Sequence, residues 1–239
     1  MIPLHDDNPT DITPLITWFF IGLCVLVFLW QVSLGQEGGQ AAVYSFGVIP
    51  AVLLGKTQLP EALAVIPADL TVFTSMFMHG GFLHLAGNML YLWIFGNNVE
   101  DAMGHVRFVI FYFLCGIAAV AGQVVQNTDS TIPMIGASGA ISGVLGAYLL
   151  LYPHARILVA IPLGFIMHMV RLPAGWVLGF WFLIQIFSSL SADPGSAGVA
   201  WYAHIGGFAA GLMLVPVFKQ RNVKLFHRAR SSGRWHERL

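Results

Sequence analysis

The sequence has few charged residues. Asp, Glu, Lys and Arg make up 9% of its 239 residues, whereas apolar residues make up 57%. A soluble domain carries roughly 25% charged residues, which solvate its surface. The apolar residues form long runs, not the short alternations of a membrane β-barrel. The composition therefore excludes an ordinary soluble domain and predicts a helical bundle in a lipid bilayer.

Cysteines and N-terminal basic residues are also scarce. The two cysteines, Cys24 and Cys115, both lie in apolar runs, so they predict neither a disulfide framework nor a metal-binding pair. Residues 1–11 contain three Asp and no Lys or Arg, whereas a cleavable signal peptide begins with a basic segment. We therefore expect the first apolar run to remain in the protein as a transmembrane helix.

Six apolar runs approach the roughly 20 residues that a transmembrane helix requires. Their approximate bounds are 14–34, 81–99, 105–126, 137–152, 173–190 and 200–218. We expect the Gly-rich residues 35–39 to stop the first run, and residues 40–72 to form a partly embedded loop with short interfacial helices. Residues 157–170 are apolar but short and interrupted by Pro162, so we interpret them as a loop. The expected fold is all-α, a polytopic membrane bundle of six transmembrane helices.

The distribution of basic residues orients this bundle. Seven of the eleven Lys and Arg follow residue 218, and the positive-inside rule places this tail in the cytoplasm. Six spans then place the N-terminus in the cytoplasm as well. In a bacterium, the bilayer concerned would be the inner membrane.

This topology brings polar residues from three spans to one depth. Spans two, four and six all run inward from the outer face, and His84, Ser138 and His204 each lie near the start of one of them. At about 1.5 Å per residue, the three side chains would lie only several ångströms below their helix starts. Polar groups inside spans are costly, which makes these residues candidates for a function.

Ser138 and His204 suit nucleophilic catalysis. A serine at a helix N-terminus can attack a carbonyl while free backbone N–H groups bind the oxyanion, and a histidine can accept its proton. The small-residue face at Gly207 and Gly211 would pack closely against that at 139–147, which would bring the two side chains together. The alternatives are an N-capping serine and a histidine bonded to a backbone carbonyl.

His84 and Asn88 lie four residues apart and therefore on one helix face. They could donate hydrogen bonds to an oxyanion, or they could hold neighbouring helices together. No carboxylate lies near the expected site within the spans. We therefore expect a Ser–His dyad without a third acid, and neither a metal site nor a cofactor.

Four blocks of the sequence resemble the rhomboid family of intramembrane serine proteases. They are residues 74–89 (TSMFMHGGFLHLAGNM), 95–101 (FGNNVED), 136–139 (GASG) and 203–207 (AHIGG). The resemblance implies a six-helix core, with Ser138 as nucleophile and His204 as base. It also implies that His84 and Asn88 help to form the oxyanion site.

The implied activity is that of a serine endopeptidase that forms an acyl-enzyme. Such an enzyme cleaves peptide bonds in or beside the transmembrane helices of its substrates. The expected partners are therefore transmembrane proteins and the lipid bilayer, not nucleic acid, and the oligomeric state stays open. The membrane domain then comprises residues 1–218, with a catalytic core at about 70–218, and residues 219–239 form a basic cytoplasmic tail.

Two positions depart from the family pattern. Leu70-Thr71 stands where many members carry Trp-Arg, and Ser142 stands where some carry a tyrosine that stacks on the catalytic histidine. What orients His204 is therefore left open.

Two other functions also stay open. A catalytically silent rhomboid-like protein would hold or escort membrane clients, but it would have lost the Ser or the His that this chain retains. A haem-binding membrane cytochrome would use His84 and His204 as axial ligands, although it gives Ser138 and Asn88 no role.

Overall fold

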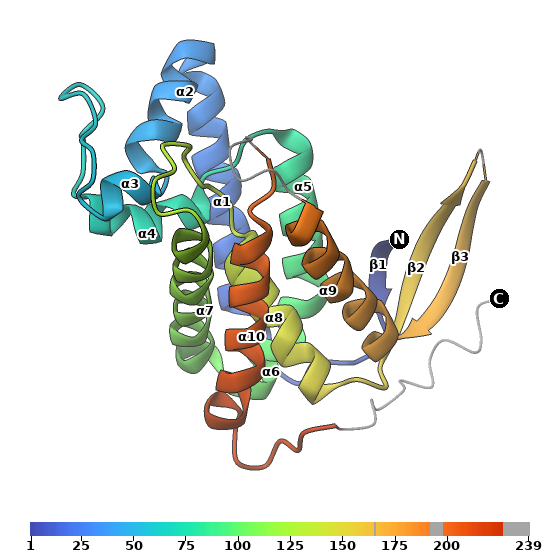
Figure 1. Ribbon diagram of the computed structural model, residues 1–239. Coiled ribbons are helices and arrows are strands. Elements are labelled where there is room, and N and C mark those ends of the chain that lie inside the picture. Colours follow the sequence, from blue (N-terminus) through green and yellow to red (C-terminus); the bar gives the residue numbers. More distant parts are fainter. Residues whose placement is uncertain (165, 192–197, 227–239) are drawn as a thin grey trace.

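The computed structural model describes residues 1–164, 166–191 and 198–226, and its architecture is mostly helical (Figure 1). Its elements, in chain order, are β1 (Ile2–Asp6), α1 (Leu15–Ser33), α2 (Gly35–Phe46), α3 (Pro50–Leu53), η1 (Ala68–Leu70), α4 (Thr71–Thr74), η2 (Ser75–Phe77), α5 (Phe82–Tyr91), η3 (Leu92–Gly96), α6 (Asn97–Met103), α7 (His105–Gln126), α8 (Ser138–Leu151), β2 (Arg156–Leu163), β3 (Ile166–Pro173), α9 (Ala174–Ser191) and α10 (Trp201–Phe218).

Each of the six predicted spans corresponds to helical structure. Among the described residues, α1, α7, α9 and α10 are long and apolar enough to cross a membrane. The fourth predicted span is α8, which is apolar but has 14 residues. The second is composite, because α5, the π-helical turn η3 and α6 follow one another without a break. The length and composition of the helices therefore support several membrane crossings.

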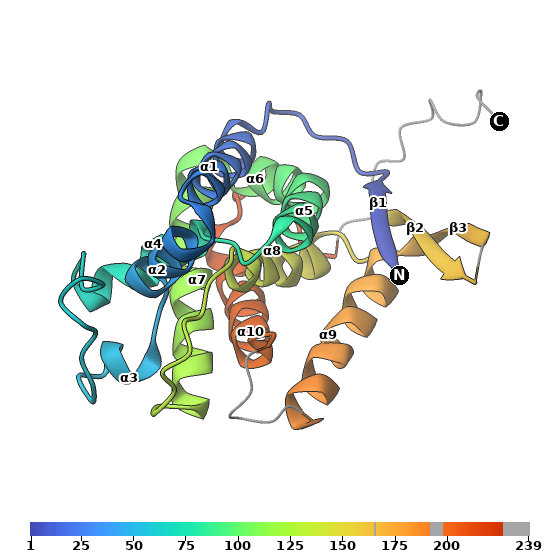
Figure 2. The same cartoon turned by 90° about the horizontal axis from the view of Figure 1, so that it is seen from above.

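The short helix α8 lies at the centre of the bundle. All residues from 139 to 148 are buried, and α7 and α10 pack against the helix (Figure 2). Gly207 and Gly211 of α10 lie so close to the carbonyl oxygens of Gly139 and Gly143 that neither position has room for a Cβ. The predicted close packing of small-residue faces is confirmed, and it fixes the start of α10 beside the start of α8.

A three-stranded antiparallel sheet stands beside α9 and corrects two predictions (Figure 1). β2 pairs with β3 in a hairpin, and β1 pairs with the other edge of β2. The loop expected at 157–170 is therefore a hairpin, and the fold is not all-α. Ile157, Val159 and Ile161 favour a strand, and Gly164 supplies the positive φ of 63° at the turn. The pairing of β2 with the distant β1 has no local sequence signal.

The Gly-rich residues 35–39 end α1 as predicted, but they do not form a loop. Gly35 has a φ of 71°, which interrupts the helix, and α2 begins at the same residue. The expected short helices of residues 40–72 are present as the end of α2, α3, η1 and the first residues of α4. Residues 54–67, between α3 and η1, contain neither helix nor strand.

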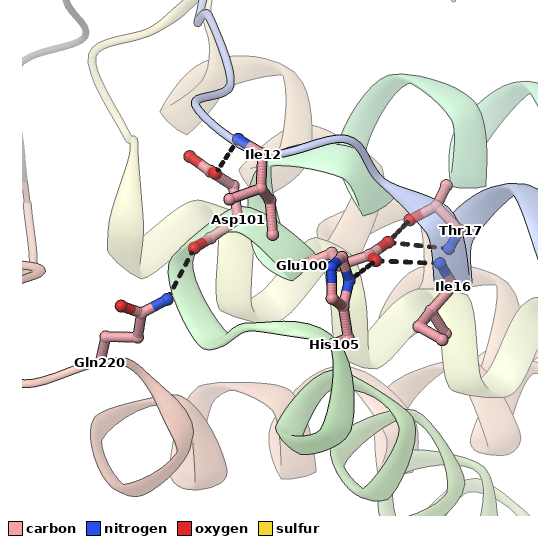
Figure 3. Close-up of polar contacts among 7 residues, drawn as sticks. All are labelled: Ile12, Ile16, Thr17, Glu100, Asp101, His105 and Gln220. Carbon is pink, nitrogen blue, oxygen red and sulfur yellow. Dashed lines mark hydrogen bonds and ion pairs between the residues drawn. The ribbon is translucent and has the colours of Figure 1, made fainter.

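A buried carboxylate fixes the start of α1. Glu100 accepts hydrogen bonds from the backbone N–H groups of Ile16 (2.9 Å) and Thr17 (2.8 Å) and from the Thr17 hydroxyl (2.7 Å) (Figure 3). Nδ1 of His105 lies 2.6 Å from the same carboxylate. The free N–H groups of a first helical turn favour an anion. Glu100 therefore caps α1 and joins it to α6 and α7.

The described beginning of the predicted tail packs against the bundle. The backbone N–H of Gln220 donates to the carbonyl of Ala102 (2.8 Å), and that of Phe226 donates to the carbonyl of Leu150 (2.7 Å). The chain therefore stays in contact with the membrane domain beyond residue 218. Four basic residues of the tail lie outside the described residues: Arg228, Arg230, Arg234 and Arg238.

Candidate active site

Ser138 and His204 meet between two helix starts. Ser138 is the first residue of α8, and His204 lies in the first turn of α10. Oγ of Ser138 lies 2.9 Å from Nε2 of His204. The loop before α8 is held in place by Gly136, whose N–H donates to the carbonyl of Ser75 (2.8 Å). A hydroxyl and an imidazole at this distance form the hydrogen bond through which a serine can lose its proton.

The imidazole of His204 has partners on its other sides as well. Its Nδ1 lies 2.7 Å from Oε1 of Gln185, a buried residue of α9. The indole of Trp181 lies 5.9 Å away between ring centroids at a tilt of 38°, and that of Trp201 lies 6.2 Å away, nearly perpendicular. Both ring nitrogens of His204 are therefore engaged within the protein, which leaves neither free to bind a haem iron.

The groups that surround His204 were not among the residues predicted from the sequence. A signal was present for Gln185, because it is a polar residue in the middle of an apolar span, and such residues are costly in a membrane. The hydroxyl of Ser142 does not bond to His204. It donates instead to the carbonyl of Ser138 (2.6 Å), one turn earlier on α8. The two tryptophans carry no comparable signal, since aromatic residues are common in spans.

His84 and Asn88 approach the backbone just before Ser138. A Cβ placed on Gly136 would lie 2.8 Å from Nε2 of His84 and 3.7 Å from Nδ2 of Asn88. Nδ1 of His84 accepts the N–H of Gly80 (3.3 Å), so the neutral ring carries its proton on Nε2. Nδ2 of Asn88 is buried and has no hydrogen-bond partner. Both side chains therefore present N–H donors to the space beside Ser138.

One cavity of about 630 Å³ is lined by the side chains of Ser138, His204, His84 and Asn88. Its walls come from α5, α7, α8, α9 and α10 and from the loop before α8. Gln123 of α7 also lines it, and the Oε1 atom of this residue is buried without a partner. The volume lies in the range of pockets that bind ligands, roughly 300–1,000 Å³. The structure thus brings all four predicted site residues together around one pocket, which is partly open to the surroundings.

His79 supports this arrangement from the segment that precedes α5. Its ring lies 5.2 Å from that of His84, and burial, together with the proximity of His84, lowers the pKa of His79 to about 4. Gln31 of α1 holds its backbone through two hydrogen bonds, of 3.0 Å to the N–H and 3.2 Å to the carbonyl. His79 is therefore neutral at physiological pH and packs against His84 without adding a charge.

The fold and the site define a class of protein. It is a multi-pass helical membrane protein in which a serine and a histidine from different helices meet in a partly open pocket between the helices. The family model described as the rhomboid domain matches residues 69–221. The chain therefore belongs to the rhomboid family.

Curated relatives support this membership. Rhomboid protein 1, mitochondrial, from Saccharomyces cerevisiae is 29% identical over 185 residues, which cover 71% of this chain and 48% of that protein. Rhomboid protease GluP from Bacillus subtilis is 33% identical over 136 residues, which cover 57% of this chain and 24% of that protein. The human presenilin-associated rhomboid-like protein, mitochondrial, is 27% identical over 175 residues, with coverages of 66% and 42%. The matches thus span about a quarter to a half of the length of these relatives.

Proposed function

We propose that this protein is an intramembrane serine endopeptidase in which Ser138 is the nucleophile and His204 is the general base. One observation carries the proposal: the 2.9 Å contact between the Ser138 hydroxyl and Nε2 of His204, inside a cavity that also holds His84 and Asn88. Membership of the rhomboid family supports it, as does the relative whose name describes it as a rhomboid protease.

The proposed reaction proceeds through an acyl-enzyme. Oγ of Ser138 attacks the carbonyl carbon of the scissile peptide bond while its proton passes to Nε2 of His204. When the tetrahedral intermediate collapses, the C–N bond breaks, and His204 gives this proton to the leaving amine. A water molecule, deprotonated by His204, then attacks the ester carbonyl; the bond to Oγ of Ser138 breaks, and His204 returns the proton to Oγ.

The negative oxygen of the tetrahedral intermediate needs hydrogen-bond donors. Nε2–H of His84, Nδ2–H of Asn88 and the backbone N–H of Ser138 are the donors that we assign to it. The unpartnered Nδ2 of Asn88 supports this assignment, because a buried donor without a partner is costly unless a ligand uses it. His84 and Asn88 lie four residues apart on α5, so both can reach this oxygen from one face of the helix.

The substrates that we propose are transmembrane proteins, cleaved in or beside a membrane-spanning helix. The 14 residues of α8 span about 21 Å, whereas the hydrocarbon core of a bilayer is about 30 Å thick. A helix shorter than the membrane supports a nucleophile that lies below the membrane surface. The polar residues of the cavity would admit the water that the reaction consumes.

We further propose six membrane crossings, formed by α1, the composite α5–η3–α6, α7, α8, α9 and α10. Both termini would then lie in the cytoplasm, in agreement with the basic residues that follow residue 218. The membrane domain comprises residues 1–218, with the catalytic core at about 70–218, and residues 219–239 form the basic tail. A role as a silent escort of membrane clients is less well supported, because the proposed nucleophile and base are both present and hydrogen-bonded.

The test is cleavage of a fluorescent transmembrane substrate by purified protein in detergent. We expect the wild-type protein to cut it and both Ser138→Ala and His204→Ala to lose activity. Ser45→Ala is a suitable control, because Ser45 is a buried serine of α2 that does not line the cavity. If Ser138→Ala cleaves as well as the wild type, the proposed mechanism is wrong.

A further inference from the structure

A third side chain completes the hydrogen bonding of the proposed dyad. Gln185 lies in the middle of α9 and is 4% exposed. Its Oε1 lies 2.7 Å from Nδ1 of His204, on the side of the ring opposite Ser138. The nucleophile, the base and this amide therefore form a continuous chain across α8, α10 and α9.

The orientation of the Gln185 amide is set by its second hydrogen bond. Its Nε2 donates to the backbone carbonyl of Trp181 (3.1 Å), one turn earlier on α9. In the flipped orientation, the amide oxygen would face this carbonyl, and two acceptors would meet. The hydrogen-bond network therefore leaves the oxygen as the atom that faces His204.

An amide oxygen only accepts hydrogen bonds, so it selects one tautomer of His204. Nδ1 of the imidazole must carry the proton in order to donate to Gln185. Nε2 then has a free lone pair, and this is the nitrogen that faces the hydroxyl of Ser138. A general base needs this tautomer, because the opposite one would direct an N–H at the serine.

We infer that Gln185 is a positioning residue, which fixes the tautomer and ring orientation of His204 for proton transfer from Ser138. This inference rests on the proposed function. Gln185 would occupy the place that a carboxylate has in a serine-protease triad, but as a neutral group. It orients the base without a buried negative charge, which would be costly inside a membrane.

The other neighbours of His204 do not select its tautomer. Trp181 and Trp201 restrict the ring by packing, but neither forms a hydrogen bond with it that would distinguish one ring nitrogen from the other. Ser142 bonds to the backbone of α8 instead. Among the described residues, Gln185 alone accepts a hydrogen bond from Nδ1 of His204.

The test compares two substitutions at one position. Gln185→Met keeps an unbranched chain of similar length but removes the acceptor, whereas Gln185→Glu keeps an acceptor and adds a charge. Ser189→Ala is the matched control: it removes a buried hydroxyl of α9 that bonds to the Ile186 carbonyl of its own helix. The measurements are kcat and KM for a transmembrane substrate against pH, and the rate of labelling by a fluorophosphonate.

We expect Gln185→Met to lower kcat and the labelling rate by about 10- to 100-fold, with KM little changed, since a misoriented base weakens proton transfer. Gln185→Glu should restore most of the activity and move the acidic limb of the pH profile to higher pH, because a carboxylate favours the protonated imidazole. This shift would show that the side chain at position 185 acts directly on the imidazole of His204. If Gln185→Met retains wild-type kcat and labelling, the inference is overturned.

A spectroscopic measurement separates this inference from the proposed function. Nitrogen-15 NMR of labelled histidine reports the tautomer of His204, identified by the signal that His204→Gln removes. We expect the Nδ1–H tautomer in the wild type and a mixture in Gln185→Met, whether or not the protein cleaves a substrate. An unchanged tautomer in Gln185→Met would overturn the inference. Should Gln185→Met not fold, an unmoved pH profile in Gln185→Glu would do the same. Full cleavage by Ser138→Ala would instead refute the protease mechanism.

Discussion

Gly207 of α10 packs directly on the backbone carbonyl of Gly139 in α8. This contact lies one turn or less from both Ser138 and His204, which are 66 residues apart in the chain. Because neither glycine has a side chain, the two helix axes approach closely, and the hydroxyl can reach the imidazole. The geometry of the candidate site thus depends on the absence of two side chains.

Gly207→Ala should therefore disturb the bundle and the site together. The new Cβ would overlap the Gly139 carbonyl, which is backbone and cannot rotate away. Overpacking of this kind costs about 1–3 kcal/mol, and it would also separate the starts of α8 and α10. We expect a lower melting temperature in detergent and a loss of cleavage and fluorophosphonate labelling.

Gly22→Ala is the matched control for this substitution. Gly22 lies in the middle of α1, and a Cβ there would meet no other atom within 4 Å. Alanine is also the better helix former, so the variant should be at least as stable as the wild type. If Gly207→Ala melts at the wild-type temperature and cleaves substrate at the wild-type rate, the close contact does not hold the site together.

Much of this architecture could be predicted from residue patterns. Apolar runs located the helices to within a few residues for most spans, because a membrane helix needs a continuous stretch of such residues. The small residues of α8 and α10 predicted their contact, and alternate span directions predicted that His84 and Ser138 would lie at one depth. These signals are local or follow from topology alone.

Other features depend on contacts that no local pattern encodes. The pairing of β1 with β2 joins segments at 2–6 and 156–163, so neither segment identifies its partner. The role inferred for Gln185 depends on the rotation of α9 about its axis, which decides whether its side chain faces lipid or His204. The sequence could show that a polar residue lies in the span, but not which way it points.

Asn88→Ala should separate the two roles considered for this residue. If Nδ2 of Asn88 binds the oxyanion, the substitution removes a bond that forms only in the transition state. We then expect kcat to fall by about 100-fold or more with KM nearly constant. The melting temperature should change little, because Nδ2 has no partner in the resting protein.

Asn97→Ala is the control, since Asn97 lies on α6 and does not line the cavity. It should leave kcat unchanged. If Asn88 instead holds helices together, the melting temperature of Asn88→Ala would fall, and the loss of activity would follow the loss of folded protein. Steady-state kinetics and thermal unfolding of the same preparations distinguish the two results.

The stability of the protein should fall as the pH rises towards neutrality because of Asp6. Burial in β1 raises the pKa of Asp6 to about 7, against the opposing effect of the hydrogen bond from the Tyr148 hydroxyl (2.6 Å). The folded state therefore holds a proton that the unfolded chain releases near its ordinary value of 3.8. The resulting stabilisation is fully present below that value and is lost as the pH rises through about 7.

Asp6→Asn should remove this dependence, because an amide does not titrate. The difference in unfolding free energy between wild type and variant should change by at most about 4 kcal/mol between pH 4 and pH 7.5, and the wild type should lose stability relative to the variant. Thermal unfolding of both proteins at several pH values measures this difference in unfolding free energy. Asp69→Asn, at an exposed carboxylate, should follow the wild type. Parallel curves for wild type and Asp6→Asn would contradict the raised pKa.

Glu100→Gln should loosen the start of α1. The buried carboxylate accepts three hydrogen bonds from Ile16 and Thr17 and lies beside His105, whereas an amide offers one acceptor oxygen and directs an NH₂ group at other donors. Lost hydrogen bonds to a buried charged group cost about 1.5–3 kcal/mol each, so a melting decrease of several degrees is expected. Hydrogen exchange at Ile16 and Thr17 should accelerate, while Glu61→Gln at an exposed position should alter neither quantity. If Glu100→Gln melts and exchanges like the wild type, water or another group satisfies these N–H donors, and the cap does not hold α1 in place.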